Sequence, residues 1–369
     1  MEDLSMGKVC KRIELRPVKV GLIYGTGEVA KAIARRLVRT PGLEIILFVR
    51  PEHPETTVKA LEAEFHDWSV GRQDGVGSLV SVTQDETRLK EVNIVINAAG
   101  MSLEKAKKNP ELAEAIKKQQ AAGKNPRAVL LGVNLPIAWE VAKKINQYCC
   151  GALILQVSNP MSGIMYFFNR LGWFDMEQII GLGDIVDILR IQELVARAFP
   201  EIAVKNFSLA ALGQHGAGIV VPRSSVGLDG LTLEQFAKFA GGNAADNLAK
   251  LEKAFAEVAD VAYLYLKDTG KTPYESPAAA AGILIETLVN PRKYCALPIV
   301  IVAPDDLPYY DIKKGEAVVM QVPVGKGAVL TNQAAELDLS PEEWRSLEKT
   351  KTDIRQEFTE ADSYLKRLA

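Results

Sequence analysis

The stretch V-K-V-G-L-I-Y-G-T-G-E-V-A, residues 18–30, decides how the chain folds. It begins with an apolar run typical of a buried strand, and helical spacing follows over residues 27–39. Between the two, Gly25, Gly27 and Ala30 stand in a G-x-G-x-x-A arrangement. Gly25 permits a tight turn, Gly27 lets the backbone approach a pyrophosphate, and Ala30 allows the helix to pack closely on the strand. Because the N–H groups that begin a helix attract anions, the stretch predicts a dinucleotide-binding unit.

Short apolar runs alternate with helical patterns through the first half of the chain. The runs expected to be strands are residues 18–24, 44–49, 79–82, 92–97 and 152–157. Strands that alternate with helices require right-handed crossovers and give a parallel, doubly wound sheet. We therefore expect an α/β fold with a Rossmann domain over residues 18–160, preceded by an N-terminal extension at residues 1–17.

The second half of the chain has a different pattern. Helices are expected at residues 184–199, 233–239, 244–267 and 341–368, and strands at residues 207–212, 218–221, 296–302 and 317–322. Helices and strands no longer alternate regularly, which favours a mixed α+β arrangement. We expect residues 161–369 to form a substrate and catalytic domain.

Composition excludes several classes of protein. The 369 residues carry a formal net charge of −2, so no strong field attracts nucleic acid or an anionic membrane. No apolar run is long enough to span a membrane, and residues 1–17 lack the apolar segment of a secretory signal. The four cysteines, Cys10, Cys149, Cys150 and Cys295, form neither a disulfide framework nor a zinc-site pattern. We expect a cytoplasmic enzyme without a metal ion that acts on a small molecule.

The end of the second expected strand bears on the choice of dinucleotide. An acidic residue there usually binds the ribose hydroxyls of NAD, but this strand continues into Val49 and Arg50. An arginine is the usual partner of a 2′-phosphate, so Arg50 slightly favours NADP. NAD stays open, because Arg50 could be a surface residue while Glu52 binds the ribose.

Two segments in the second domain carry candidate catalytic residues. Asp187 and Arg190 are three residues apart on an expected helix and so share a face. His215 lies in a glycine-flanked loop, and the other two histidines of the chain belong to the first domain. A histidine can accept the hydroxyl proton when a hydride leaves an alcohol, and a carboxylate on its far nitrogen fixes the tautomer. We assign His215 and Asp187 to these roles, and Arg190 to holding a substrate carboxylate through paired hydrogen bonds.

Several short motifs together resemble the malate and lactate dehydrogenase family. They are, in family order, G-T-G-E-V-A at residues 25–30, I-N-A-A-G at 96–100, S-N-P-M at 158–161, V-D-I-L-R at 186–190 and G-Q-H-G at 213–216. Two C-terminal segments, V-P-V-G-K-G-A and L-D-L-S-P-E-E-W, also resemble the family's last strand and helix, so the likeness runs from about residue 18 to residue 365. The order of the motifs makes the resemblance far more specific than any single one.

The resemblance implies roles for further residues. Asn159 would contact the substrate or the nicotinamide ribose, and Ala98 and Gly100 would lie against the adenosine and pyrophosphate side of the cofactor. Asn134 matches a cofactor-contacting asparagine of the family. The resemblance also implies a homodimer or a homotetramer.

The sequence departs from the family pattern after Gly100, where the family continues into a mobile loop with one or two arginines. Here a lysine-rich helical segment intervenes, within an inserted loop at about residues 101–126. Arg127 precedes Asn134 by seven residues, which is the family's spacing for the loop arginine, so we expect Arg127 to polarise the substrate carbonyl. The specificity position of the family falls near Gln119 to Ala121, where malate-type enzymes have an arginine and lactate-type enzymes often have a glutamine. Gln119 and Gln120 therefore favour a monocarboxylate or an unusual substrate. A lysine of the inserted loop could supply a cation instead, the candidates being Lys105, Lys107, Lys108 and Lys124.

Three functions remain open from the sequence. The first is a malate- or lactate-type dehydrogenase, with the malate type slightly favoured. The second is a relative with a rebuilt loop that acts on a different 2-oxo acid. The third is a dinucleotide-binding sensor without turnover, although a sensor would not need Asp187, Arg190 and His215 together. The related metal-dependent glycosidases need a Cys/His metal site, and no cysteine lies near His215 in the sequence.

Overall fold

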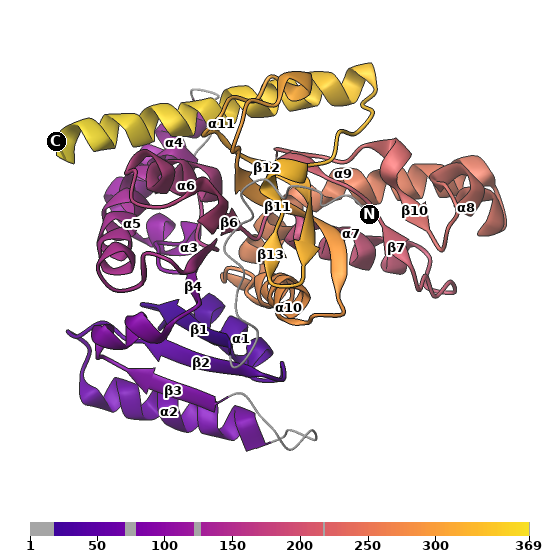
Figure 1. Ribbon diagram of the computed structural model, residues 1–369. Coiled ribbons are helices and arrows are strands. Elements are labelled where there is room, and N and C mark those ends of the chain that lie inside the picture. Colours follow the sequence, from indigo (N-terminus) through magenta and orange to yellow (C-terminus); the bar gives the residue numbers. More distant parts are fainter. Residues whose placement is uncertain (1–17, 71–78, 122–126, 217, 369) are drawn as a thin grey trace, which may run out of the picture.

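The computed structural model describes residues 18–70, 79–121, 127–216 and 218–368, so the expected N-terminal extension lies outside the described residues. A single 11-stranded sheet forms the centre of the molecule (Figure 1). Its strands follow the order β3-β2-β1-β4-β5-β6-β11-β12-β8-β9, and β13 pairs with β12. The strands are β1 (Val18–Ile23), β2 (Leu43–Phe48), β3 (Leu79–Thr83), β4 (Ile94–Asn97), β5 (Leu153–Gln156), β6 (Ile179–Gly181), β8 (Leu212–Gln214), β9 (Gly218–Val220), β11 (Tyr294–Val302), β12 (Ala317–Gly325) and β13 (Ala328–Val329).

The half of the sheet from β3 to β6 is parallel, as the alternation of strands and helices predicts. These strands consist almost entirely of apolar residues, and every residue of β4 and β5 is buried. A sheet covered by helices on both faces requires such continuous apolar strands, because neither face meets water. The α/β doubly wound fold is therefore confirmed.

The other half of the sheet is antiparallel. Strand β11 pairs antiparallel with β6 in the register Val300↔Gly181 and with β12 along its whole length. Because β6 also pairs with β5, the sheet continues across residue 160 without a break. A separate small sheet joins β7 (Phe207–Ser208) and β10 (Gly227–Leu228), so the single strand expected at residues 207–212 is in fact split between β7 and β8.

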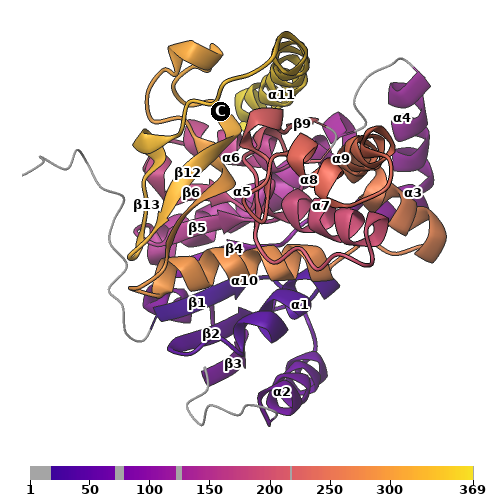
Figure 2. The ribbon, with the colours of Figure 1, turned by 90° about the vertical axis from the view of Figure 1, so that its right-hand side faces the viewer.

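Helices cover the sheet. They are α1 (Glu28–Leu37), α2 (Glu55–Val70), α3 (Leu103–Lys108), α4 (Pro110–Ala121), α5 (Arg127–Cys149), α6 (Met161–Arg170), α7 (Ile185–Ala198), α8 (Leu233–Phe239), α9 (Ala244–Thr269), α10 (Glu275–Val289) and α11 (Pro341–Leu368). Helix α10 packs along α1 and also contacts α7, so it joins the first half of the chain to the second half (Figure 2). The long α11 contacts α5 and α6. The lysine-rich helical segment expected within about residues 101–126 forms α4.

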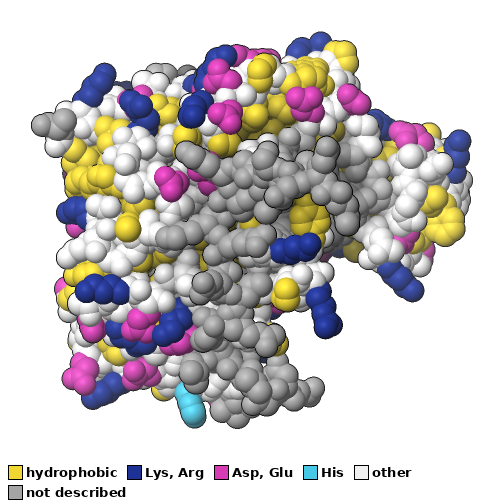
Figure 3. Space-filling model, viewed as in Figure 1, with side chains coloured by type: hydrophobic (Ala, Val, Ile, Leu, Met, Phe, Trp, Pro, Cys, Tyr) yellow, Lys and Arg dark blue, Asp and Glu magenta, His cyan; other side chains and the backbone are white. Residues whose placement is uncertain are grey.

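No helix among the described residues is both long enough and apolar enough to cross a membrane. On the face drawn in Figure 3, basic and acidic side chains are interspersed among the described residues. This mixture agrees with the formal net charge of −2.

Candidate active site

Many of the residues expected to form the site follow the carboxyl ends of four neighbouring parallel strands, β1, β4, β5 and β6. Parallel strands end on the same edge of a sheet, which is where open α/β sheets bind ligands. The segments that begin there are residues 24–27 after β1, 98–101 after β4, 157–160 after β5 and 182–187 after β6. The fold thus brings the four candidate segments to one edge.

The two glycines after β1 serve different purposes. A Cβ atom on Gly25 would lie 2.8 Å from Cβ of Ala30 and 3.0 Å from Leu47, so only glycine fits the turn. A Cβ atom on Gly27 would meet nothing within 4 Å. Gly27 is the N-cap of α1 and supplies no side-chain hydrogen bond to the helix. The space beside Gly27 at the beginning of α1 is therefore open, and a helix N-terminus of this kind suits a pyrophosphate group.

Hydrogen-bonded amides order the ends of β4 and β5. Asn97, which is 1% exposed, donates to Gln156 over 2.8 Å and accepts from the backbone N–H of Ala99. Gln156 donates in turn to the carbonyl and the hydroxyl of Ser158. This chain of bonds fixes the backbone on either side of Ala98. Gln156 was not expected to belong to the site. An amide at the end of an apolar strand nevertheless indicates a buried polar group that must find hydrogen-bond partners.

Asn134 on α5 ties two of these segments together. Its amide nitrogen donates to the carbonyl of Asn159 over 2.7 Å and to that of Met101 over 3.2 Å, and its amide oxygen accepts from the N–H of Met101 over 2.6 Å. Gly100 passes so close that a Cβ atom there would lie 3.3 Å from that oxygen. The amide nitrogen of Asn134 has both hydrogens engaged by the backbone, so Asn134 orders the loops. The contact with a cofactor that the resemblance implies stays a prediction.

Arg50 follows β2 and lies on an aromatic ring. Its guanidinium carbon is 4.6 Å from the ring centroid of Tyr24, and one of its nitrogens is 3.6 Å from a carboxylate oxygen of Glu52. Tyr24 has a left-handed backbone, with φ of 51°, and donates a hydrogen bond to Glu86. The arginine is therefore held at the end of β2, near the turn that begins at Gly25.

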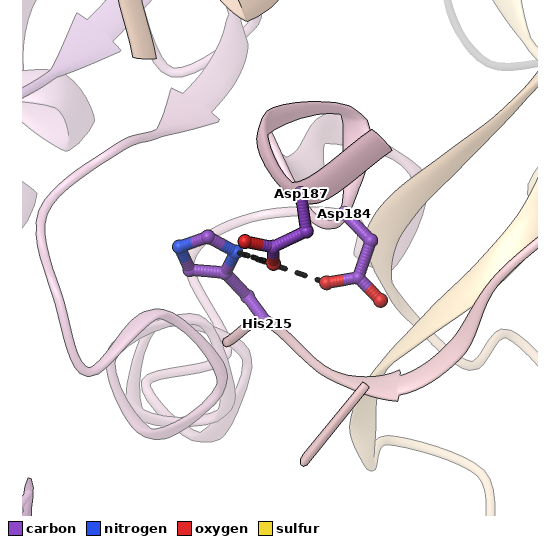
Figure 4. A group of neighbouring side chains, drawn as sticks. All are labelled: Asp184, Asp187 and His215. Carbon is purple, nitrogen blue, oxygen red and sulfur yellow. Dashed lines mark ion pairs between the residues drawn. The ribbon is translucent and has the colours of Figure 1, made fainter. Parts of the chain in front are cut away.

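The side chain of His215 meets that of Asp187 at the start of α7 (Figure 4), and Arg190 of the same helix contacts Asp187. Nδ1 of His215, in the loop between β8 and β9, lies 2.8 Å from a carboxylate oxygen of Asp187. The other oxygen of Asp187 accepts from Nη1 of Arg190 over 2.9 Å. Figure 4 shows that the second ring nitrogen of His215 points away from the carboxylates. The convergence predicted from the sequence is thus present in the structure.

Local geometry explains why these groups meet. Asp187 and Arg190 are paired at i and i+3 on α7, as the helical spacing indicates. The N–H of Gly216 donates to Asp187 over 3.0 Å, which attaches the histidine loop to the helix. Gly213 and Gly216 both have left-handed backbones, with φ of 99° and 88°. These two conformations favour glycine, so the residues that flank His215 shape its loop.

Arg190 also contacts α10. Its Nη2 atom donates to the hydroxyl of Ser276 over 3.3 Å. The side chain of Arg190 is 10% exposed and that of Asp187 is fully buried. Two of the five N–H donors of the guanidinium group thus bond to protein groups, and these bonds fix the plane of the group. Ser276 had no recognisable signal in the sequence, because the helix that carries it was not expected.

A second carboxylate, that of Asp184, lies beside the histidine and was not expected from the sequence. One of its oxygens is 3.7 Å from Nδ1 of His215, and its side chain is fully buried. Among the described residues, neither of its oxygens accepts a hydrogen bond. Asp184 precedes Asp187 by three residues, and this spacing could have found it.

These charges change one another's proton affinity. Burial lowers the pKa of His215, but the nearby charge of Asp187 and the contacts with Asp184 outweigh burial and raise this pKa to about 9. For Asp187, burial favours the neutral form, but His215 and Arg190 outweigh it and hold the pKa well below its usual range. Burial is the largest influence on Asp184 and raises its pKa to about 7. The site therefore favours an imidazolium beside an ionised Asp187.

Ligand atoms of Asp184, Asp187 and His215 lie within 4.8 Å of one another, a spacing at which such groups could hold a metal ion. In this arrangement Arg190 and a protonated His215 already supply two positive charges to the two carboxylates. The charge of the cluster is therefore balanced by the chain's own residues.

Two predictions about the inserted loop concern residues whose side chains the structure does not describe. Arg127 is the first residue of α5, and Gln119 belongs to α4, but both side chains lie outside the described part of the structure. The expectations that Arg127 polarises a carbonyl and that Gln119 sets specificity stay predictions.

Comparison with known proteins relates the chain to two groups of enzymes. It is 24% identical to a malate dehydrogenase from Sorangium cellulosum over 91% of this chain and 95% of the relative. It is 22% identical to malate dehydrogenase 2 of Aquifex aeolicus over 98% of this chain and 99% of the relative. No family model matches the sequence.

A solved structure shares the fold over nearly the whole chain. It is the lactate dehydrogenase of Cryptosporidium parvum, crystallised with lactic acid and nicotinamide adenine dinucleotide. The two chains superpose with a TM-score of 0.74 at 22% identity, over 95% of this chain and 99% of the other. The likeness thus covers both halves of the molecule.

Proposed function

Since this chain is related to the malate and lactate dehydrogenases, we propose that it catalyses hydride transfer between a nicotinamide dinucleotide and C2 of a small 2-hydroxy acid. The observation that carries the proposal is the convergence of His215, Asp187 and Arg190. An imidazole, its carboxylate partner and a guanidinium are the groups that moving a proton and holding a carboxylate require.

His215 moves the proton. Its Nδ1 atom is engaged by Asp187, so the ring is oriented and the second nitrogen, Nε2, is the one that faces the substrate oxygen. In the reductive direction Nε2 donates its proton to that oxygen, and in the oxidative direction it accepts the hydroxyl proton. Asp187 stabilises the imidazolium and stays ionised throughout.

Arg190 holds the substrate carboxylate. Contacts with Asp187 and Ser276 fix the guanidinium plane, and the remaining donors can form paired hydrogen bonds to a carboxylate. A substrate anchored in this way presents one face of its C2 atom and cannot rotate freely.

The turn between β1 and α1 would hold the cofactor. Gly25 and Gly27 open the space in front of α1, and Ala98 and Gly100 border the same edge of the sheet. Asn159, whose backbone is fixed by Asn134, would contact the substrate or the ribose. When bound, the nicotinamide would supply or accept the hydride.

We propose malate with a slight preference over lactate, and relatives of both kinds cover more than nine tenths of the chain. We propose that Arg127 or a lysine of the inserted loop assists the substrate carbonyl or a second carboxylate. A different 2-oxo acid remains the alternative, because the loop departs from the family pattern.

Either NAD or NADP is proposed as the cofactor, with NADP slightly favoured. Residues 49–51 at the end of β2 include no carboxylate, and Arg50 is held there by Tyr24. An Arg50→Asp variant is expected to shift the ratio of kcat/KM values toward NADH. A control that replaces Arg39, Arg39→Asp, should leave that ratio unchanged, and an unchanged ratio in Arg50→Asp would remove Arg50 from cofactor recognition.

The proposed reaction is tested by following NADH or NADPH oxidation with oxaloacetate, pyruvate and other 2-oxo acids. Turnover of at least one acid is expected, and His215→Asn should abolish it. His66→Asn is a matched control, because His66 is an exposed residue on α2. If cofactor binds but the wild type turns over no acid in the panel, the chain is a sensor and the proposal is wrong.

A further inference from the structure

We propose that Asp184 is a positioning residue that keeps His215 protonated, so that the site favours reduction of a 2-oxo acid over oxidation of a 2-hydroxy acid. The inference rests on the proposed function, because it concerns the proton that His215 moves. It adds a second carboxylate to the pair expected from the sequence.

The position of Asp184 supports this role. The residue is the N-cap of α7, where an aspartate side chain normally accepts from the first N–H groups of the helix. Asp184 makes no such bond, and its carboxylate lies instead 3.7 Å from Nδ1 of His215. Figure 4 shows both carboxylates directed at the same ring nitrogen.

The surroundings hold Asp184 in this orientation. Its N–H donates to the carbonyl of Pro298 on β11, and its carbonyl accepts from Ile188 on α7. Gly183 before it has a φ of 57°, and a Cβ atom there would lie 2.5 Å from that same carbonyl of Pro298. The backbone is therefore pressed against β11 on one side, and the carboxylate is directed toward the histidine loop.

An ionised carboxylate without hydrogen bonds is costly to bury unless a positive charge lies close to it. Above a pH of about 7, where Asp184 loses its proton, Asp184 and Asp187 bring two negative charges to a buried cluster, and Arg190 brings one positive charge. The cluster is neutral only when His215 carries the second positive charge. The N-terminal end of α7 also favours negative charge at Asp184.

The charged groups that face His215 come from one side. The start of α7 contributes Asp184, Asp187 and Arg190, whereas Ser276 of α10 and Pro298 of β11 are uncharged. On α10 the neighbouring acid, Glu275, is paired with Arg35 of α1. The two aspartates at the start of α7 therefore stabilise the proton on His215.

A protonated His215 affects reduction and oxidation differently. During reduction a hydride adds to C2, the bond between Nε2 and its proton breaks, and a new O–H bond forms on the substrate. His215 is then neutral and the cluster has a net negative charge, so uptake of a proton from solvent restores the starting state. Oxidation needs neutral His215 at the outset, which the two carboxylates disfavour.

The test measures the proton on His215 directly. With 13C-labelled histidine, NMR titration follows the ring signals of the three histidines in the full-length protein, and His215→Asn assigns the signal. The proposal predicts that Asp184→Asn lowers the pH midpoint of His215 by about one unit, because one nearby opposite charge is lost. Asp246→Asn, an exposed replacement on α9, should leave the midpoint unchanged.

A second measurement ties the proton to turnover. The alkaline limb of kcat/KM for reduction should move to lower pH in Asp184→Asn by the same shift as the NMR midpoint. Asp184→Ser provides a second uncharged variant if the first fails to fold. An unchanged NMR midpoint in a folded variant would overturn the role of Asp184, whatever the activity. A shifted midpoint in a protein that turns over no acid would overturn only the proposed function.

Discussion

Replacing Asp187 by asparagine removes the charge on which the proposed site most depends. The carboxylate accepts from Arg190 and from the N–H of Gly216, and it lies 2.8 Å from Nδ1 of His215. Asparagine keeps the shape but must present an NH2 group to one of these donors. Loss of one partner from a buried pair of charges should also cost about 3 kcal/mol of unfolding free energy.

The effect on activity follows from the pKa of His215. Burial is the largest influence and lowers this pKa, while the charge of Asp187 is the largest opposing influence and helps raise it to about 9. Without that charge, the pKa should fall to its ordinary value of about 6.5 or below. At pH 8 the protonated fraction then falls from about 90% to about 3%, so reduction slows about 30-fold from protonation alone.

The pH dependence of the loss of reductive activity shows whether Asp187 acts through the proton on His215. At pH 6 both proteins hold most of the histidine protonated, so the part of the loss caused by protonation should shrink to less than about twofold. The assay is kcat/KM for reduction of the best 2-oxo acid between pH 6 and pH 9, with Asp246→Asn as control. An equal loss at pH 6 and pH 8 would refute the reasoning, because it would mean that Asp187 acts only through geometry.

Further outcomes concern the substrate, the cofactor and pH. Arg190→Lys should raise the KM for the 2-oxo acid by about 10- to 100-fold, because paired hydrogen bonds to the carboxylate are lost, whereas Arg197→Lys on the exposed face of α7 should not change it. Gly25→Ala should destabilise the fold by about 1–3 kcal/mol in chemical denaturation, because its Cβ atom would lie 2.8 Å from Ala30. Gly27→Ala should cost less than about 1 kcal/mol yet weaken cofactor binding measured by calorimetry, and equal stability losses in the two glycine variants would contradict this reading. Reduction should decline and oxidation should rise as pH passes about 9, because His215 loses its proton there; coincident pH profiles for the two directions would exclude His215 as the group that titrates.

Much of the nucleotide half could be predicted from the sequence. The strand and helix around Gly25 have strong local signals, because buried parallel strands are continuous apolar runs and glycine is required at the turn. The convergence of Asp187, Arg190 and His215 was also expected. Helical spacing joined the first two residues, and the glycine-flanked loop in the second half of the chain indicated His215.

Other features have no local signal. Helix α10 is apolar on most of its surface, because it lies between α1 and α7, and so it lacks the periodicity of an amphipathic helix. Strand β6 is only three residues long, so its position in the sheet depends on pairing with β5 and β11. Asp184 has a spacing signal, three residues before Asp187, but the sequence does not specify that its carboxylate points to the histidine and leaves the helix uncapped.

The central claim, that this chain transfers a hydride to C2 of a 2-oxo acid, is tested most directly by isotope transfer. The protein is incubated with NADH or NADPH deuterated at C4 of the nicotinamide, on either face, together with the best 2-oxo acid, and the product is analysed by mass spectrometry and NMR. The account predicts one deuterium on C2 of the 2-hydroxy acid from one of the two faces. Product without deuterium from either labelled face, or no 2-hydroxy acid at all, would contradict it.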